Sequence, residues 1–420
     1  MSLPSTRRDV WLVLGTAVLL GTGLGAYYLL AWPVKLGLNY RVYDAAARAV
    51  LTGTDFYAVT PPSSRFHYLY PPVTVLAFVP LARLGDWHVG YAVLTLHTVV
   101  ASGWLTLLLV RYVESTGSRV PRSDRLLIGA YVLVSVHAVP SLAYGQVNHL
   151  LVAAFGAGLV WLERDREWLA GVALALPAFV KVFPAAVGLW LLYRRAWRTI
   201  VAAVATAGTL TAAGLAAFGP GTYRTYVFDV LLARRDTQAF VGGLHPGVSY
   251  VTLRRPLSVL FPTVDPTWYA VGAAVLLAPV LAALYWHART TTDRLVALYA
   301  TLVAMLLFFP SLLLYYVFLT FPLVVLLYDL PQGWGRRLFV GGTLLATLSL
   351  SFNAVPRLVA LLPLTPQTAT QVAATLRPVF AFGTPVLYGC LLSLVGCLVY
   401  RVERDPVPDA RETTSPGTSD

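Results

Sequence analysis

The chain has 420 residues, of which 57% are hydrophobic and 12% are charged, and its formal net charge is +12. Soluble domains carry roughly 25% charged residues, so this composition excludes an ordinary water-soluble protein. The basic residues lie between apolar runs rather than in a basic domain, which argues against a nucleic-acid-binding protein.

Apolar runs of about 17 to 25 residues recur along the chain up to residue 402, as membrane spans do. Lipid offers no hydrogen bonds to the backbone, so helices are the expected spanning form. We predict an all-α polytopic bundle with about 11–12 membrane helices, because two short runs are either crossings or re-entrant segments. The predicted spans are 10–31, 71–84, 88–110, 126–143, 147–162, 168–193, 199–218, 268–286, 295–309, 312–327, 338–352 and 379–400.

Residues 1–402 are expected to form one membrane domain, and 403–420 a disordered cytoplasmic tail rich in Pro and Thr. The first run is about as long as a full span and ends in Trp32-Pro33 rather than at a small-residue cleavage site. We therefore read it as a retained helix and not as a signal peptide.

Positive charge predicts the orientation, because loops rich in Lys and Arg stay on the cytoplasmic side. With both termini inside, most arginine-rich loops fall there, but Arg111, Arg119, Arg122 and Arg125 fall outside, against the rule. In this frame the long polar segments 33–70 and 219–266 face away from the cytoplasm. We expect a multi-pass protein of the cell membrane with an extracytoplasmic working surface.

The first outer segment contains an amphipathic stretch, 40–51, which we expect to lie along the membrane interface. Arg41, Asp44 and Arg48 are spaced three and four residues apart, so one carboxylate lies between two guanidinium groups on one helix face. Two interpretations stay open. The three residues are either a surface ion-pair ladder or a carboxylate and cations beside a phosphorylated lipid.

Three further polar residues follow in this outer segment. Asp55 comes after the predicted helix end and is either a cap or a second acid. His67 and Tyr68 lie in an aromatic stretch that enters the membrane, where His67 is either an interfacial hydrogen-bonding group or a proton carrier.

Two other polar groups stand out later in the chain. Gln146 and Asn148 lie between two predicted spans, where amides either join helices or bind a polar ligand. His245 lies in a glycine-rich outer loop that is followed by two arginines.

Lys181 is the sharpest single signal, because it lies near the middle of a long apolar run between Pro177 and Pro184. Placing an ammonium group in lipid would cost roughly 3 kcal/mol or more, so it must face protein, water or an anion. A phosphate-binding role in a cavity and a structural ion pair are the two interpretations.

Together these segments resemble glycosyltransferase family 87, membrane mannosyltransferases of the GT-C fold that use a polyprenyl-phosphate sugar. The resemblance rests on residues 41–57, on 68–72 leading to Pro80-Leu81, on 145–148, on 169–171 with Lys181 and Pro184, and on 310–322. It implies transfer of a sugar, mannose by default, from a polyprenyl-phosphate donor to a lipid or glycan acceptor. The transfer would be inverting and would take place on the non-cytoplasmic face. Membrane lipids are the other expected partners, and no nucleic acid, cofactor or metal is expected.

The resemblance also implies roles for residues. The family has an aspartate base just before the Val-Tyr pair, where this chain has Asn39, and an amide cannot be that base. Asp44 and Asp55 are then the candidate bases, although neighbouring arginines would weaken Asp44 in this role. The donor phosphate is assigned to Lys181, Arg41 and Arg48, and acceptor or sugar contacts to Asn39, His67, Tyr68, Gln146, Asn148 and His245.

Two other functions stay open. A secondary transporter or lipid-linked oligosaccharide flippase would also have about a dozen helices with broken spans. Against it, the sequence shows neither a matched pair of interrupted helices nor acidic residues near the midplane. A non-catalytic relative of the family is kept open by Asn39.

Overall fold

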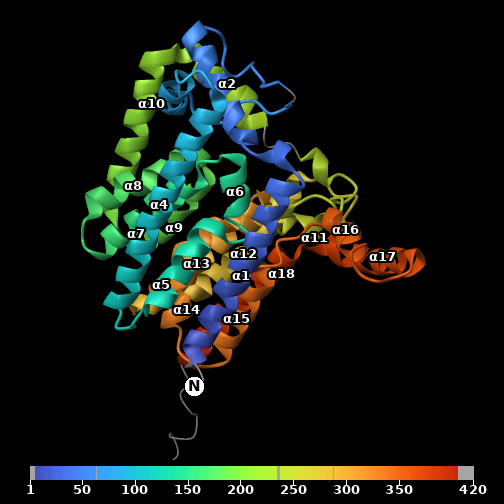
Figure 1. Cartoon of the computed structure of the whole chain (residues 1–420). Coiled ribbons are helices and arrows are strands. Elements are labelled where there is room, and N and C mark those ends of the chain that lie inside the picture. Colours follow the sequence, from blue (N-terminus) through green and yellow to red (C-terminus); the bar gives the residue numbers. More distant parts are fainter. Residues whose placement is uncertain (1–4, 63, 234–236, 287, 405–420) are drawn as a thin grey trace, which may run out of the picture.

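The computed structural model describes residues 5–62, 64–233, 237–286 and 288–404 (Figure 1). Most of the predicted tail therefore lies outside the described residues. The described chain is almost entirely helical, and its strands β1 (Tyr250–Val251) and β2 (Ser311–Leu312) form one short antiparallel pair. The predicted all-α polytopic bundle is confirmed.

In the described part of the chain, six helices are long and apolar enough to cross a membrane. They are α1 (Ser5–Leu30), α4 (Trp87–Ser115), α10 (Trp197–Thr225), α12 (Thr267–Tyr285), α13 (Thr291–Phe308) and α18 (Pro385–Arg404). Shorter helices complete the bundle, namely α5 (Arg122–Val134), α6 (Val139–Tyr144), α7 (Asn148–Glu163), α8 (Glu167–Lys181), α9 (Val187–Tyr193), α14 (Thr320–Asp329) and α15 (Trp334–Ala346).

The remaining helices connect the spans. They are α2 (Leu38–Thr52), α3 (Val79–Ala82), α11 (Arg254–Leu260), α16 (Val355–Val359) and α17 (Pro366–Phe382). Short turns of 3-10 helix are η1 (Pro33–Lys35), η2 (Pro72–Ala77), η3 (Phe183–Ala186), η6 (Gln238–Phe240), η7 (Leu313–Leu319) and η8 (Phe352–Ala354), and η4 (Tyr226–Leu232) is a π-helix.

The core of the bundle lies around α13 and α14, whose residues are almost all buried. These two sequences are apolar on almost every side, and in this structure other helices surround them. On the flank, α15 and α18 pack closely through glycines. A Cβ added at Gly342 would lie 2.4 Å from the backbone nitrogen of Ser393, so the approach of these helices requires a glycine there.

Both described ends of the chain lie at the same end of the molecule (Figure 1). Arg336 at the start of α15 binds Asp9 at 2.9 Å, and Glu403 accepts a 2.7 Å hydrogen bond from the Trp334 backbone. We call this end, formed by residues 5–9, 112–125, 163–167, 193–198, 286–294, 328–337 and 400–404, the terminal end. The opposite end carries α2 and is called the α2 end.

Segment 71–84 is not a span, which settles one of the open alternatives. It folds as η2 and α3, too short to cross, and stays at the α2 end. The next helix, α4, therefore runs toward the terminal end, where Thr116 donates a 2.9 Å hydrogen bond to Asp329. The prediction that Arg111, Arg119, Arg122 and Arg125 lie opposite the other arginines is wrong, because the α4–α5 connection is at the terminal end.

Segment 168–193 is not a single span either. Helix α8 ends at Lys181, the chain reverses through Val182 and η3, and α9 returns to the terminal end, where Arg194 pairs with Glu163. Neither 71–84 nor 168–193 crosses the bundle, so the structure has two crossings fewer than predicted before residue 194. Because two missing crossings leave the direction of the chain unchanged, the later predicted spans run in the right direction.

Other boundaries differ from the prediction in detail. The predicted span 126–143 is broken at Ser135 into α5 and α6, and 312–327 begins as 3-10 helix. The predicted amphipathic helix is confirmed as α2, which buries Tyr40, Tyr43 and a row of alanines and ends at Gly53 with φ +69°. Helix α17 was not predicted.

Candidate active site

The candidate site is centred on Lys181, at the α2 end of α8. The side chain is 9% exposed, and its Nζ lies 5.3 Å from the ring centre of Tyr70 and 4.8 Å from that of Tyr315. Tyr70 precedes η2, whereas Tyr315 belongs to η7. A cation over aromatic faces gains roughly 0.5 to 2 kcal/mol, so the ammonium group is held by protein and does not face bare lipid.

The backbone next to Lys181 fixes this position. Val182 has φ +61° and ψ −52°, an outlying conformation for a β-branched residue. Strain of about 1 to 3 kcal/mol persists only where the surroundings enforce it, and such residues cluster at functional sites. The turn places the cation at the C-terminus of α8, where the helix dipole favours positive charge.

Tyrosines form the wall of the site on the side of the first outer segment. Tyr43 on α2 shares a 3.0 Å hydroxyl hydrogen bond with Tyr70, and Tyr57 donates a 2.7 Å bond to the Tyr70 carbonyl. Tyr68 is fully buried and bonds Thr74 at 2.7 Å. Burial raises the pKa of Tyr43 and of Tyr68 well above the ordinary value, so these phenols stay neutral.

Asp44 directly follows Tyr43 in α2. It is 7% exposed, and its Oδ2 accepts a 2.7 Å hydrogen bond from Nε of Arg48, while its Oδ1 is buried and has no hydrogen-bond partner among the described residues. Arg48 also donates to the Gly85 carbonyl at 2.8 Å. The bond from Asp44 raises the pKa of Arg48.

Arg41 does not take part in this pair. Its Nη2 donates to the Val34 carbonyl at 2.9 Å, and its guanidinium carbon lies 5.1 Å from the ring centre of Trp87. The three-residue ladder that the spacing suggests is therefore reduced to one ion pair, between Asp44 and Arg48.

Three of the predicted amides meet between α2 and α7. Asn148 Nδ2 donates to Ser141 Oγ at 2.7 Å and to Gln146 Oε1 at 2.8 Å, and Gln146 Nε2 reaches Asn39 Oδ1 at 3.4 Å. Asn148 is fully buried, and its Oδ1 has no hydrogen-bond partner in the described part of the chain. The network ties the start of α2 to the loop before α7.

The other predicted residues lie in surface positions. Asp55 accepts a 2.9 Å hydrogen bond from the Tyr57 backbone, as a turn cap does. His67 is exposed, and His245 is exposed and accepts a 3.1 Å bond from the Gly247 backbone. The structure does not bring these two histidines into contact with Lys181. Among the residues described, no group of three or more His, Cys, Asp or Glu is placed to hold a metal ion.

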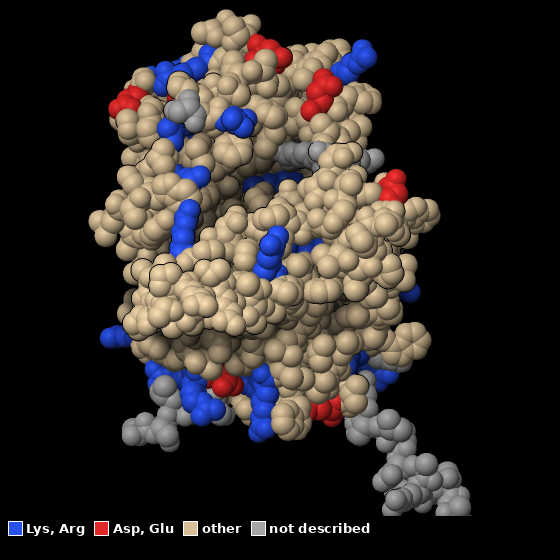
Figure 2. Space-filling model, turned by 90° about the vertical axis from the view of Figure 1, so that its right-hand side faces the viewer, with Lys and Arg blue, Asp and Glu red and all other residues tan. Residues whose placement is uncertain are grey.

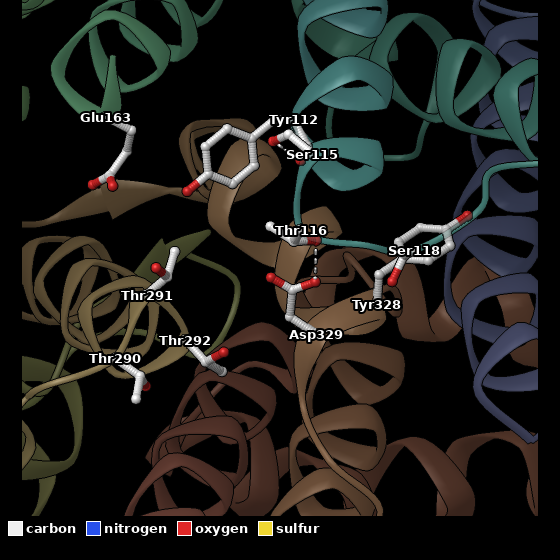
Figure 3. A pocket seen from close by; sticks show the side chains of 10 residues that line it. All are labelled: Tyr112, Ser115, Thr116, Ser118, Glu163, Thr290, Thr291, Thr292, Tyr328 and Asp329. Carbon is white, nitrogen blue, oxygen red and sulfur yellow. Dashed lines mark hydrogen bonds between the residues drawn. The ribbon is translucent and has the colours of Figure 1, made fainter. Parts of the chain in front are cut away.

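A cavity that was not predicted lies at the terminal end (Figure 3). Its volume is about 580 Å³, and hydroxyls and two carboxylates line it, from Tyr112, Ser115, Thr116, Ser118, Glu163, Thr290, Thr291, Thr292, Tyr328 and Asp329. Helix α8 begins at the terminal end, where this cavity lies, and reaches Lys181 after 15 residues, a length of about 22 Å. The cavity is therefore distinct from the candidate site.

Sequence reasoning missed the residues that hold the ammonium group. Tyr70 belongs to the aromatic-rich first outer segment, as do Tyr43 and Tyr57, which bond to it, and Tyr315 follows the break after α13. The aromatic density of these segments was visible, but only the tertiary fold shows that it converges on Lys181.

The model of glycosyltransferase family 87 matches residues 68–315, more than half of the chain, and this range includes Tyr70, Lys181 and Tyr315. The chain belongs to glycosyltransferase family 87. Helix α2, with Asp44 and Arg48, precedes the matched range.

Curated relatives of this family 87 chain come from mycobacteria. A polyprenol-phosphate-mannose-dependent alpha-(1-2)-phosphatidylinositol mannoside mannosyltransferase of Mycobacterium tuberculosis is 29% identical over 232 residues, which are 50% of this chain and 51% of the relative. An enzyme of the same name from Mycolicibacterium smegmatis is 28% identical over 200 residues, 44% of each chain. The chain thus spans about half the length, or less, of these relatives.

Proposed function

We propose that this chain is a mannosyltransferase that uses polyprenol-phosphate mannose and a lipid or glycan hydroxyl as acceptor. One observation carries the proposal. The buried ammonium of Lys181 lies against Tyr70 and Tyr315, inside the range that matches family 87. The names of the mycobacterial relatives support the choice of donor.

In the proposed reaction, the acceptor oxygen forms a bond to the anomeric carbon as the bond from that carbon to the phosphate oxygen breaks. The acceptor proton passes to a carboxylate, and polyprenyl phosphate leaves with the electron pair, inverting the anomeric centre. Lys181 would stabilise the charge that develops on the leaving phosphate. The neutral tyrosines around it would exclude water and give the sugar and isoprenoid an apolar wall.

Asp44 is the preferred base. Its Oδ2 is held by Arg48, and its buried Oδ1 has no hydrogen-bond partner among the described residues, so Oδ1 is the oxygen that would take the acceptor proton. The Oδ1 of Asp55, by contrast, accepts the Tyr57 backbone N–H. A base must come within hydrogen-bond reach of the acceptor hydroxyl, which places the acceptor beside α2.

The proposed side of the reaction is the non-cytoplasmic face of the cell membrane. Arginine-rich connections gather at the terminal end, and positive loops stay in the cytoplasm. The α2 end would then face away from the cytoplasm.

The test is a transfer assay with the full chain in lipid nanodiscs and radiolabelled polyprenyl-phosphate mannose. We expect label in a new glycosidic product, and a loss of about 100-fold or more in rate for Asp44→Asn, the usual effect of removing a general base. Asp55→Asn is the matched control, and it should keep its rate within a few-fold.

Two results would reject parts of this proposal. Full activity of Asp44→Asn would remove Asp44 as the base. Movement of labelled lipid across a vesicle membrane without a new glycosidic bond would favour the transporter or flippase and would remove the transferase.

A further inference from the structure

Residues 347–384 form an arm that projects from the bundle and contains η8, α16 and α17 (Figure 1). The arm leads directly into α18, whose 20 residues run to the terminal end. A helix of this length spans about 30 Å, which is the thickness of the hydrocarbon core. If α18 spans the hydrocarbon core, the arm lies at the membrane boundary on the side toward the α2 end.

The arm exposes leucines that the bundle does not cover. Leu361 is 81% exposed, Leu362 54% and Leu358 45%, whereas Val359 and Phe380 pack into a small core of their own. Adjacent exposed leucines would be unfavourable in water and mark an interaction surface. At the level of the membrane boundary, the acyl region of the bilayer covers such residues.

The charge of this region is entirely positive. No Asp or Glu occurs between Asp329 and Glu403, and the arm carries Arg357 and Arg377. Figure 2 views the face that bears the arm and shows basic side chains gathered around a hollow in it. Anionic headgroups are complementary to such a surface.

Two cations of this region meet at one indole ring. Nζ of Lys35 lies 4.7 Å from the ring centre of Trp32, and the guanidinium carbon of Arg357 lies 5.7 Å from the same ring. Neither cation takes part in an ion pair that the structure describes. Tryptophan favours the headgroup level of a bilayer, and a lysine and an arginine on one ring offer several donors to a phosphate.

We propose that the arm and the Trp32–Lys35–Arg357 cluster bind an anionic phospholipid of the leaflet at the α2 end. Lys35 and Arg357 hold the headgroup phosphate, and Leu358, Leu361 and Leu362 enter the acyl region. The proposal does not depend on the transferase function, because neither cation belongs to the candidate active site.

The first experiment counts lipids retained by the full chain. The protein is placed in nanodiscs of equal parts phosphatidylglycerol and phosphatidylcholine and then released for native mass spectrometry. We expect preferential retention of phosphatidylglycerol, and about 10- to 30-fold weaker retention for the double variant Lys35→Gln/Arg357→Gln, from about 1 kcal/mol per cation. Arg83→Gln, an exposed cation of the same end, is the matched control and should behave as the unaltered chain.

The second measurement tests the leucines without depending on affinity. Leu361→Cys labelled with a fluorophore should be quenched by phospholipids spin-labelled near the headgroup and protected from aqueous iodide. Cys390 and Cys397 are fully buried, so the unaltered chain should remain unlabelled. Equal retention of the two lipids by the unaltered chain, unchanged retention by the double variant, or iodide quenching at residue 361 would each overturn the proposal.

Discussion

The two ends of the molecule differ in the groups that several of their cations contact. At the terminal end, arginines pair with carboxylates, as in Arg7–Asp124, Arg194–Glu163, Arg336–Asp9 and Arg401–Asp293. At the α2 end, Lys35, Lys181 and Arg357 lie over aromatic rings. Among the described residues of this end, Asp44 pairs with Arg48 and Asp86 contacts His88, and one oxygen of Asp44 has no hydrogen-bond partner in the described part of the chain.

Asp293 shows how completely the terminal end satisfies a charge. The residue is 2% exposed, and its carboxylate binds Arg401 at 3.0 Å, Arg404 at 3.3 Å and the Tyr400 hydroxyl at 3.0 Å, in addition to capping α13. Such a network joins the start of one helix to the end of another. At the terminal end the charges join helices, and at the α2 end anion binding is the role that we propose for them.

The largest effect is expected from Arg336→Met. Arg336 is 2% exposed and binds Asp9 and the carbonyls of Leu327 and Leu330 at the end of α14. Breaking such a buried pair by removing one partner costs about 3 to 5 kcal/mol, so the free energy of unfolding should fall by roughly that amount. Denaturant unfolding in mixed micelles measures it.

The neighbouring Arg337 provides the control for this prediction. It is exposed and lies over Trp334, so Arg337→Met should change the free energy of unfolding by less than about 1 kcal/mol. The rate per folded molecule should be unchanged in both variants. An Arg336→Met protein as stable as the unaltered chain would contradict a structural role for the terminal-end charges.

Lys181→Met should act mainly on binding of the polyprenyl-phosphate donor, while loss of the contacts with Tyr70 and Tyr315 should lower the free energy of unfolding by about 0.5 to 2 kcal/mol. A hydrogen bond to a charged group contributes about 1.5 to 3 kcal/mol, which corresponds to roughly 10- to 100-fold in donor affinity. Lys181→Arg keeps the charge and should recover part of the loss. Donor titration followed by tyrosine fluorescence measures the affinity, and an unchanged value in folded Lys181→Met would remove the phosphate role.

Much of the fold could be predicted from the sequence, because the apolar runs and the period of α2 follow directly from helix geometry. The topology between residues 85 and 163 was inverted, since length alone does not separate a crossing from a segment such as η2 and α3. The reversal at Val182 was hidden as well, because a β-branched residue with positive φ has no sequence signal. The misplaced arginines were the one visible sign of the error.

The candidate site was predictable in part. A lysine in an apolar run stands out because placing its charge in lipid costs free energy. The aromatic rings that hold it, however, come from segments more than 100 residues away on either side. Helical spacing correctly suggested that Asp44 and Arg48 would meet. It could not show that Arg41 turns to Val34 and Trp87, because those contacts depend on how the chain enters α2.

The smallest effect is expected from Tyr43→Phe, a change in the tyrosine wall beside Lys181. The change removes only the 3.0 Å hydrogen bond to Tyr70, whose ring lies under Lys181. One such bond contributes about 0.5 to 1.5 kcal/mol, so unfolding should weaken by that amount, and donor affinity should fall by no more than a few-fold. Tyr70→Phe removes the same bond from the other side and should lower both quantities by at least as much. If Tyr43→Phe lowered donor affinity as strongly as Lys181→Met does, the anion would be bound by the tyrosine hydroxyls, and the cation of the α2 end would be structural like those of the terminal end.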